Sequence, residues 1–284
     1  MKTKNDMSLK ALINKKAKEI NAAPQLVMQN YIMECLLDRI SRSQFKDNFI
    51  LKGGFLLSSV LGLENRSTMD MDTTVTGFPL TKEELPKIIQ FICSTEVDDD
   101  FTFTFDRTED IREIDDYPGL RVFLFADYGK IHAPFSIDVT TGDKITPSEI
   151  DYSYKRLFDK DCIQIKSYPL ETVMAEKLET ILSRNIANTR PRDFYDVYAL
   201  RPFLLQHPTN TLKLAIENTS KKRNTAHFFS NCKEILTEIE NDKTMQSRWK
   251  SFAKTRPYAT GLIFETVCNS VRDLLIRSEY LEIN

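Results

Sequence analysis

The chain has 284 residues, of which 41% are hydrophobic and 28% are charged. These values are ordinary for a globular protein and exclude a collagen-like or low-complexity chain. No apolar run approaches the ~20 residues that cross a bilayer, and MKTKNDMSLK lacks the apolar core of a signal peptide. The five cysteines show no Cys-x-x-Cys spacing, so we expect reduced thiols in a cytoplasmic protein without a membrane partner.

The net charge of −2 is unevenly distributed. Residues 1–150 hold 18 Lys and Arg against 24 Asp and Glu, whereas residues 151–284 hold 21 against 17. A basic C-terminal half is compatible with a surface that faces nucleic acid. A solvated helical surface explains the same excess equally well.

The first half of the chain begins with helical periodicity and continues with short apolar runs. Residues 8–43 predict two helices, the first opening at Ser8. Residues 49–51 predict a short strand that leads into Gly53-Gly54 and a short buried helix. The run MDMDTTV, residues 69–75, predicts the next strand.

A β-rich region follows. Residues 81–96 predict a helix with Thr81 as N-cap and Glu84 completing a capping box. The runs FTFTFD, TEDIREI, GLRVFLFADYG and HAPFSIDVTTG then alternate like strands joined by turns. Asp115 and Asp116 fall between two of these runs and are typical of a turn.

The strand pattern stops near residue 165, and helical patterns occupy the rest of the chain. The expected helices span residues 169–184, 192–205, 209–219, 227–241, 243–253 and 258–280. We therefore predict the α+β class, with a mixed β-sheet flanked by helices and then an all-helical domain. The predicted domains are residues 1–165 and 166–284.

Two aspartates in the run MDMDTTV are the first chemical signal. Successive strand side chains point to opposite faces, so Asp70 and Asp72 should share a face. Two carboxylates on one face repel each other unless a cation lies between them. Oxygen ligands suit Mg²⁺, or Mn²⁺, which pairs carboxylates with substrate phosphates. A solvated strand or turn pair is the competing interpretation.

A third acid lies in a later strand. Asp138 stands among Phe135, Ile137 and Val139 in an alternating run. If this strand pairs beside the first, Asp70, Asp72 and Asp138 converge on one metal site. Two metals there would clamp the attacking and leaving oxygens of a phosphoryl displacement.

The Gly53-Gly54 turn comes shortly before these acids. A glycine turn that opens a helix offers free backbone N–H groups and a positive helix end to phosphate. A phosphate-binding turn beside metal carboxylates predicts chemistry on a nucleoside triphosphate.

Together these blocks resemble the AbiEii/AbiGii toxin family of nucleotidyltransferases, which includes the MenT-type toxins and belongs to the DNA polymerase β-like superfamily. The similar blocks are the KGG turn, RSTMDMD, the later IDV strand, YPLETVMAEKLETILSR and TRPRDFYDVYAL, in family order from about Leu51 to Leu200. The resemblance implies the same fold and a nucleotidyl-transfer activity.

The resemblance also implies a second set of site residues. Lys177 matches the family lysine that contacts the triphosphate, although a lysine beside buried residues more often snorkels to solvent. Asp193 and Asp196 match the family's R-D-x-x-D helix, where one of them orients Lys177 or the acceptor hydroxyl. Arg192 stands where the family often has lysine. An intrahelical charge pair is the alternative reading of these acids.

The nucleotide-binding turn departs from the broader superfamily. That superfamily has a Gly-Ser turn, whereas this chain has Gly53-Gly54, as the toxin branch does. We expect Ser67 and Thr68 to supply hydroxyl contacts to phosphate and Arg66 to add positive charge.

The predicted function is a Mg²⁺-dependent nucleotidyltransferase toxin of a toxin–antitoxin or phage abortive-infection pair. By resemblance, the acceptor hydroxyl is the tRNA 3′ end, and a cognate antitoxin is the partner. Two rivals stay open. One is a nucleotide-binding regulator without transfer activity that acts through a protein partner, and the other is transfer onto a protein or small molecule.

Overall fold

A computed structural model describes residues 2–111 and 119–282 of the chain. Asp115 and Asp116, assigned to a turn from the sequence, lie outside the described residues. The chain divides into two compact units, each described here by itself. Unit 1 comprises Met1–Asp143 and Glu149–Ser167, and unit 2 comprises Lys144–Ser148 and Tyr168–Asn284.

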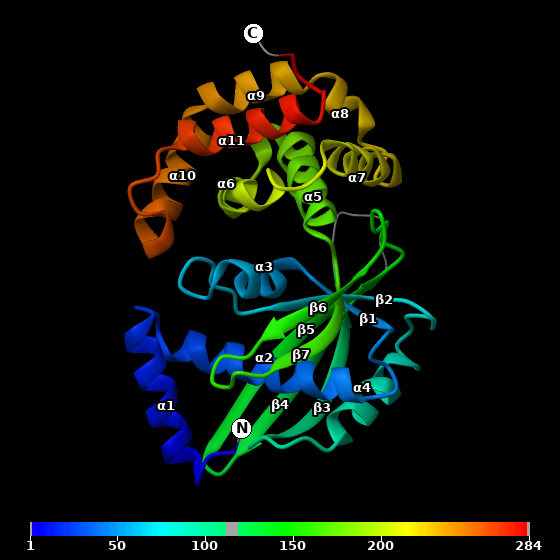
Figure 1. The fold of residues 1–284 in the computed structure, drawn as a ribbon, viewed down its shortest axis with the longest axis vertical. Helices are drawn as coiled ribbons and strands as arrows, with labels where there is room; N and C mark the ends of the chain where they lie inside the picture. The colour runs from blue at the N-terminus through cyan, green and yellow to red at the C-terminus, as the bar shows by residue number, and fades with distance from the viewer. Residues whose placement is uncertain (1, 112–118, 283–284) are drawn as a thin grey trace. The chain divides into compact units, whose positions relative to one another are not determined.

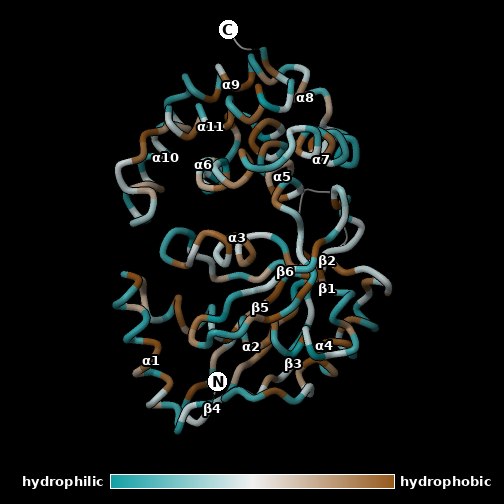
Figure 2. Tube along the Cα trace, in the orientation of Figure 1, coloured by the Kyte–Doolittle hydropathy of each residue, from teal (hydrophilic) through white to brown (hydrophobic). Residues whose placement is uncertain are grey.

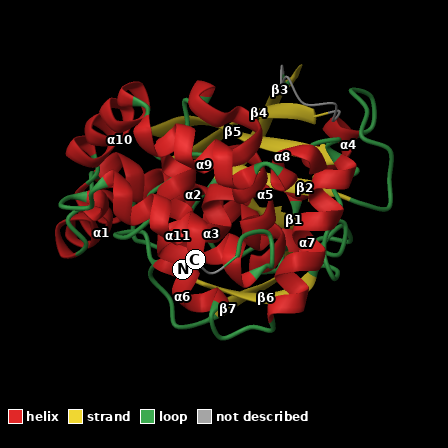
Figure 3. Ribbon diagram, turned by 90° about the horizontal axis from the view of Figure 1, so that it is seen from above, coloured by secondary structure: helices red, strands yellow, loops and turns green. Residues whose placement is uncertain are grey.

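Unit 1 is built on a seven-stranded mixed sheet, drawn in yellow in Figure 3. The strand order is β3-β4-β5-β2-β1-β7-β6. Parallel pairing joins β2 to β5 and β1 to β7, and the other neighbours are antiparallel. The strands are β1 Phe49–Lys52, β2 Met71–Val75, β3 Thr102–Asp110, β4 Gly119–Tyr128, β5 Ile131–Thr141, β6 Ile150–Lys155 and β7 Cys162–Ser167.

Within the described part of unit 1, four helices accompany this sheet (Figure 1). The longest, α2, is buried over most of its central turns and contacts both β7 and α4. Helix α1 packs on α2 and alternates hydrophilic and hydrophobic colour along its trace (Figure 2). The short helix α3 contacts β1 and β2, and α4 contacts β3. Their bounds are α1 Asp6–Glu19, α2 Pro24–Arg42, α3 Gly53–Leu61 and α4 Leu85–Ser94.

Two predicted helix starts differ from the structure. Helix α1 begins at Asp6, because the N-cap is Asn5, whose side chain accepts a hydrogen bond from the Ser8 backbone N–H at 2.9 Å. Thr81 accepts from the Glu84 N–H at 3.1 Å as predicted for a cap. That bond closes a turn, however, and the α-helical bonding starts only at Leu85.

Two strands were missing from the sequence prediction. The pattern near residues 150–167 is short and polar on one side, yet it forms β6 and β7, and β7 pairs in parallel with β1. The runs FTFTFD and TEDIREI were predicted as separate strands, and residues 112–114 of the second run lie outside the described residues. The first run and the residues TED of the second form one strand, β3, with an irregularity between Phe105 and Arg107.

The secondary-structure elements described in unit 2 are all helical. The predicted helix 227–241 is broken at Asn231, whose side chain donates to the His227 carbonyl. The predicted helix 258–280 begins only at Phe264. The elements are α5 Leu170–Arg184, η1 Asn185–Ala187, α6 Pro191–Leu204, α7 Thr209–Lys222, α8 Ala226–Ser230, α9 Cys232–Asn241, α10 Lys243–Thr255, η2 Pro257–Ala259 and α11 Phe264–Arg277.

Helix α5 organises the interior of unit 2. Its apolar side chains, Val173, Met174, Leu178 and Ile181, are at most 3% exposed. It contacts α6, α7, α8 and α9, so its apolar stripe is covered by several helices. Across the described ranges of both units, no helix is long and apolar enough to cross a membrane.

Candidate active site

The register of the central strands places two acids side by side. Asp72 on β2 is the direct partner of Asp138 on the parallel strand β5 and of Lys52 on the antiparallel strand β1. Residues paired across neighbouring strands present their side chains on the same face. The predicted pairing of the Asp138 strand beside the Asp72 strand is therefore confirmed.

Asp70 occupies a different position from the one expected. It is exposed and lies between a bend at Met69 and the start of β2, so the strand alternation begins only at Met71. The segment before the strand is tied to α2, since Asn30 donates to the Thr68 carbonyl at 2.8 Å and Gln29 to the Met69 carbonyl at 3.3 Å. The Asp70 charge nonetheless acts on Asp72. Asp70 therefore lies near Asp72 because these hydrogen bonds hold the segment before β2, and not because the two residues share a strand face.

The glycine turn lies directly against Asp72. Gly53 has a φ of +62°, and a Cβ there would lie 2.0 Å from Asp72 Oδ2. The Gly54 N–H donates to the same oxygen at 3.2 Å. A Cβ on Gly54 would come within 2.8 Å of Thr68 Oγ1. Glycine is required at both positions because Asp72 and Thr68 lie too close to leave room for a Cβ. The turn brings the N-terminus of α3 to the Asp72 carboxylate.

Arg66 supports the loop that carries the predicted hydroxyl contacts. Its side chain is only 2% exposed, and its guanidinium donates to the Ser67 carbonyl at 2.7 Å. The Thr68 hydroxyl also accepts from the Asp70 N–H at 3.3 Å. The structure thus places Arg66, Ser67 and Thr68 in one ordered loop beside the Gly53-Gly54 turn.

The surroundings of Asp72 disfavour the ionised form of its carboxylate. Burial raises its pKa above the ordinary value, and the charges of Asp138 and Asp70 act in the same direction. Lys52 and the Gly54 N–H oppose this rise. A cation bound here would relieve the remaining repulsion among the acids.

Lys52 was not singled out from the sequence. Its ammonium lies 2.6 Å from Asp143 Oδ2 and donates to Thr140 Oγ1 at 2.7 Å. These contacts hold the cation at the end of β1, next to the glycine turn. The available signal was its position immediately before Gly53-Gly54.

Arg121 is a second residue that the sequence did not reveal. On β4 it is the direct partner of Asp138. Its Nε and Nη2 donate to the two oxygens of that carboxylate, each at 2.7 Å. The predicted third metal ligand is thus engaged by a guanidinium in this structure.

These carboxylate oxygens suit a hard divalent cation, but they do not form a complete set of metal ligands. The described ranges hold no cluster of three or more His, Cys, Asp or Glu arranged to bind a metal. The expected convergence of Asp70, Asp72 and Asp138 is therefore only partly met. Carboxylate oxygens beside a glycine turn that opens a helix still fit Mg²⁺, because that ion takes further oxygens from water and phosphate.

In unit 2 the structure brings together three of the predicted residues. Lys177 Nζ on α5 lies 2.6 Å from Asp193 Oδ1 and 3.0 Å from Asp196 Oδ2 on α6. The two carboxylates are 1% and 0% exposed. Both acids contact the lysine, so the pair orients Lys177 jointly. Lysine snorkelling to solvent is excluded, since its side chain is 12% exposed.

A further arginine, which the sequence did not single out, joins this cluster. Arg190 lies 2.9 Å from Asp193 Oδ2 through Nε. Arg192 is half-buried near the start of α6. Arg190 precedes the helix by one residue, which is why the helical pattern did not draw attention to it.

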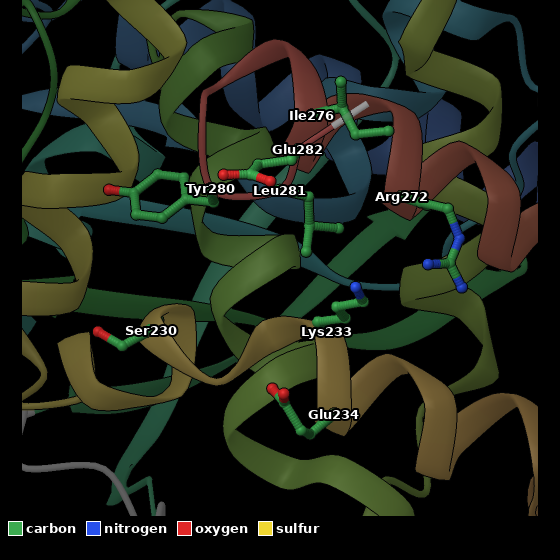
Figure 4. A pocket seen from close by; sticks show the side chains of 8 residues that line it. All are labelled: Ser230, Lys233, Glu234, Arg272, Ile276, Tyr280, Leu281 and Glu282. Carbon is green, nitrogen blue, oxygen red and sulfur yellow. The ribbon is translucent and has the colours of Figure 1, made fainter. Parts of the chain in front are cut away.

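Unit 2 also contains a hollow of about 440 Å³ between residues of α9, α11 and the following segment (Figure 4). Its lining includes Lys233, Glu234, Arg272 and Glu282, and Arg272 pairs with Glu240 at 2.6 Å. None of the predicted site residues lines it. Its mixed charges select no class of ligand.

The fold is that of a nucleotidyltransferase. The chain is similar to the crystal structure of a putative nucleotidyltransferase from H. pylori and to that of JHP933 from Helicobacter pylori. Each comparison has a TM-score of 0.51 at 13% identity over 90% of this chain, covering 94% and 91% of the respective neighbours. At such identity the likeness shows the fold.

The family follows from the sequence match. Residues 35–275 match the model described as nucleotidyl transferase AbiEii toxin, type IV TA system. The chain therefore belongs to the AbiEii nucleotidyltransferase toxin family and is a nucleotidyltransferase, as its sequence blocks predicted. No curated protein matches it significantly.

Proposed function

We propose that this enzyme moves a nucleoside monophosphate from an NTP to an acceptor hydroxyl and releases pyrophosphate. The observation that carries the proposal is the contact of the Gly53-Gly54 turn with Asp72. It puts N–H groups at the N-terminus of α3 beside a carboxylate that needs a counter-charge. Phosphate and metal recognition thus meet at one point of the sheet.

We assign Asp70 and Asp72 as ligands of Mg²⁺ or Mn²⁺, with Asp138 as the third. The cation would supply charge neutralisation at the reacting phosphate. The Gly53 and Gly54 backbone and the Thr68 loop orient the triphosphate. Asp138 would also accept the proton of the attacking hydroxyl once Arg121 has left it.

The unit 2 cluster is assigned to the same reaction through family membership. Lys177 would neutralise charge on the departing pyrophosphate, and Asp193 and Asp196 would hold its ammonium in one orientation. Fixing a flexible lysine in advance lowers the entropy lost when the phosphate binds. Arg192 is a further proposed contact to the nucleotide.

The acceptor and partners are proposed from the family. The family is described as a toxin of a type IV TA system, and on that ground we propose an antitoxin partner, action in the cytoplasm and a part in an abortive response to phage. The tRNA 3′ end is the leading acceptor. Other RNA, a protein, or a small molecule would serve the same chemistry.

The test separates these acceptors. The purified protein, each α-labelled NTP and Mg²⁺ are incubated with total RNA, with protein lysate and with small-molecule extract. Label on RNA that disappears with Asp72→Asn supports the tRNA proposal, and trimming of the 3′ end locates it. Label confined to protein or small molecules replaces that acceptor. If expression of the protein arrests growth but the purified protein transfers label to none of the fractions, the non-transferring regulator is favoured.

A further inference from the structure

We propose that Arg121 holds Asp138 until a divalent cation and nucleotide arrive, and that its released guanidinium then binds a phosphate of the nucleotide. This inference rests on the proposed function. Arg121 would be a positioning residue for the third metal carboxylate and a direct contact for the triphosphate.

The pairing geometry is specific. Arg121 and Asp138 are opposite each other in the antiparallel β4–β5 pair. The guanidinium donates one hydrogen bond to each carboxylate oxygen, both at 2.7 Å, so it occupies one acceptor site on each oxygen and compensates the carboxylate charge. A cation that approaches Asp138 therefore meets a carboxylate whose charge is already compensated, and the cation and the guanidinium repel each other.

The pair can be broken without disturbing the core. The Arg121 side chain is 45% exposed and that of Asp138 is 19% exposed. Exposed ion pairs contribute little to folding, because water screens them and the side chains lose entropy. The guanidinium can therefore swing away on its flexible stem.

The neighbouring lysine offers a useful contrast. Lys52 also lies beside Asp72, but its side chain is 14% exposed and its partner Asp143 is 7% exposed. It is held in addition by the Thr140 hydroxyl. Of these two cations, Lys52 is fixed in the sheet and Arg121 is at the solvent-facing edge of the acids.

In the metal-free protein, the positive charge of Arg121 would compensate the negative charges of the nearby aspartates. Its pKa is raised by its hydrogen bonds to Asp138, with smaller contributions from the charges of Asp138, Asp70 and Asp72. It thus compensates the same acids that a divalent cation would compensate. The cation and Arg121 compete for Asp138, and a displaced planar guanidinium is well matched to phosphate oxygens.

The first experiment measures Mn²⁺ binding without nucleotide, by electron paramagnetic resonance of free Mn²⁺. Arg121→Gln should bind Mn²⁺ several-fold more tightly than wild type, because the competitor for Asp138 is gone. Arg121→Lys keeps the charge but loses the fork, and should fall between them. Arg107→Gln is the matched control, since Arg107 on β3 is an exposed arginine paired with Asp106 and Glu109.

The second experiment measures binding of inorganic tripolyphosphate in the presence of saturating Mn²⁺. Arg121→Gln should weaken it about tenfold, as expected for loss of a charge-assisted bidentate contact. Arg107→Gln should leave it unchanged. Melting temperatures of all variants should match wild type, which excludes misfolding as the cause.

The outcomes separate this inference from the proposed function. Unchanged or weaker Mn²⁺ binding by Arg121→Gln overturns the competition, even if wild type binds the metal well. Unchanged tripolyphosphate binding overturns the phosphate contact. Wild-type protein that binds neither probe overturns the metal and nucleotide site itself.

Discussion

Gly53 and Asp72 are packed so closely that a Cβ on the glycine would lie 2.0 Å from the carboxylate oxygen. Eighteen residues separate Gly54 from Asp72, yet the Gly54 N–H donates to that same oxygen. The turn and the acid therefore lie in direct contact, with no room for a side chain between them.

Gly53→Ala should abolish nucleotide transfer. The added methyl must displace Asp72 or the turn, and the backbone φ of +62° is also unfavourable for alanine. Gly261→Ala is the matched control, because its φ is +84° but nothing lies within 4 Å of a Cβ there. It should cost about 1–2 kcal/mol of stability and spare activity. Urea unfolding and transfer assays decide, and an active Gly53→Ala protein would contradict the required close approach.

Asp72→Asn should reduce transfer at least about a hundredfold while leaving the fold intact. The amide removes a metal ligand and also removes a charge that burial and two nearby acids destabilise. The melting temperature without metal should therefore equal or exceed that of wild type. Transfer at the wild-type rate would refute the assignment of Asp72 to the metal.

Lys177→Ala should lower the free energy of unfolding by about 3 kcal/mol, because two buried carboxylates lose their shared ammonium. Adding Asp193→Asn and Asp196→Asn should recover much of that loss. Urea denaturation measures both changes. An unchanged unfolding midpoint in Lys177→Ala would show that the cluster contributes no net stability.

Glu34 provides a test by pH. The side chain is 1% exposed, and its carboxylate accepts from the Leu157 N–H at 2.7 Å. Burial raises its pKa from 4.5 to about 7, against the opposing Leu157 hydrogen bond and the charge of Arg156. The folded state therefore retains the proton that the unfolded chain releases. Its stabilising contribution is complete below pH 4.5 and is lost as pH rises through 7.

The size of the effect is about 3 kcal/mol, from about 1.36 kcal/mol per pKa unit. Glu34→Gln cannot ionise, and its amide oxygen can still accept from Leu157. The difference in unfolding free energy between Glu34→Gln and wild type should therefore grow in favour of the variant between pH 4.5 and 7. Parallel stability curves would contradict a raised pKa.

The order and type of most elements could be predicted from local pattern. The Gly53-Gly54 turn, the Asp138 strand and the lysine helix each carry strong short-range signals, so their placement agrees with the structure. Strand β7 could not be found this way, because its identity depends on pairing in parallel with β1, far away in sequence.

The partners of the acids were also hidden from sequence. Arg121 faces Asp138 only because β4 and β5 pair in one register, and a shift of one residue would put the two side chains on opposite faces. The sequence predicts Asp70 within the strand because the alternation of side chains continues through the whole run MDMDTTV. The hydrogen bonds from Asn30 and Gln29, which come from a distant helix, hold the preceding segment out of the sheet.

The most direct test of the account follows the two ends of the triphosphate. The purified protein is given Mg²⁺, an RNA acceptor pool and each NTP labelled either at the α-phosphate or at the γ-phosphate. We predict that the α-label becomes attached to the acceptor and the γ-label leaves as pyrophosphate, in equal amounts, and that both events disappear in Asp72→Asn. Transfer of the γ-label to the acceptor, or equal transfer by Asp72→Asn, would contradict nucleotidyl transfer at the Asp72 site.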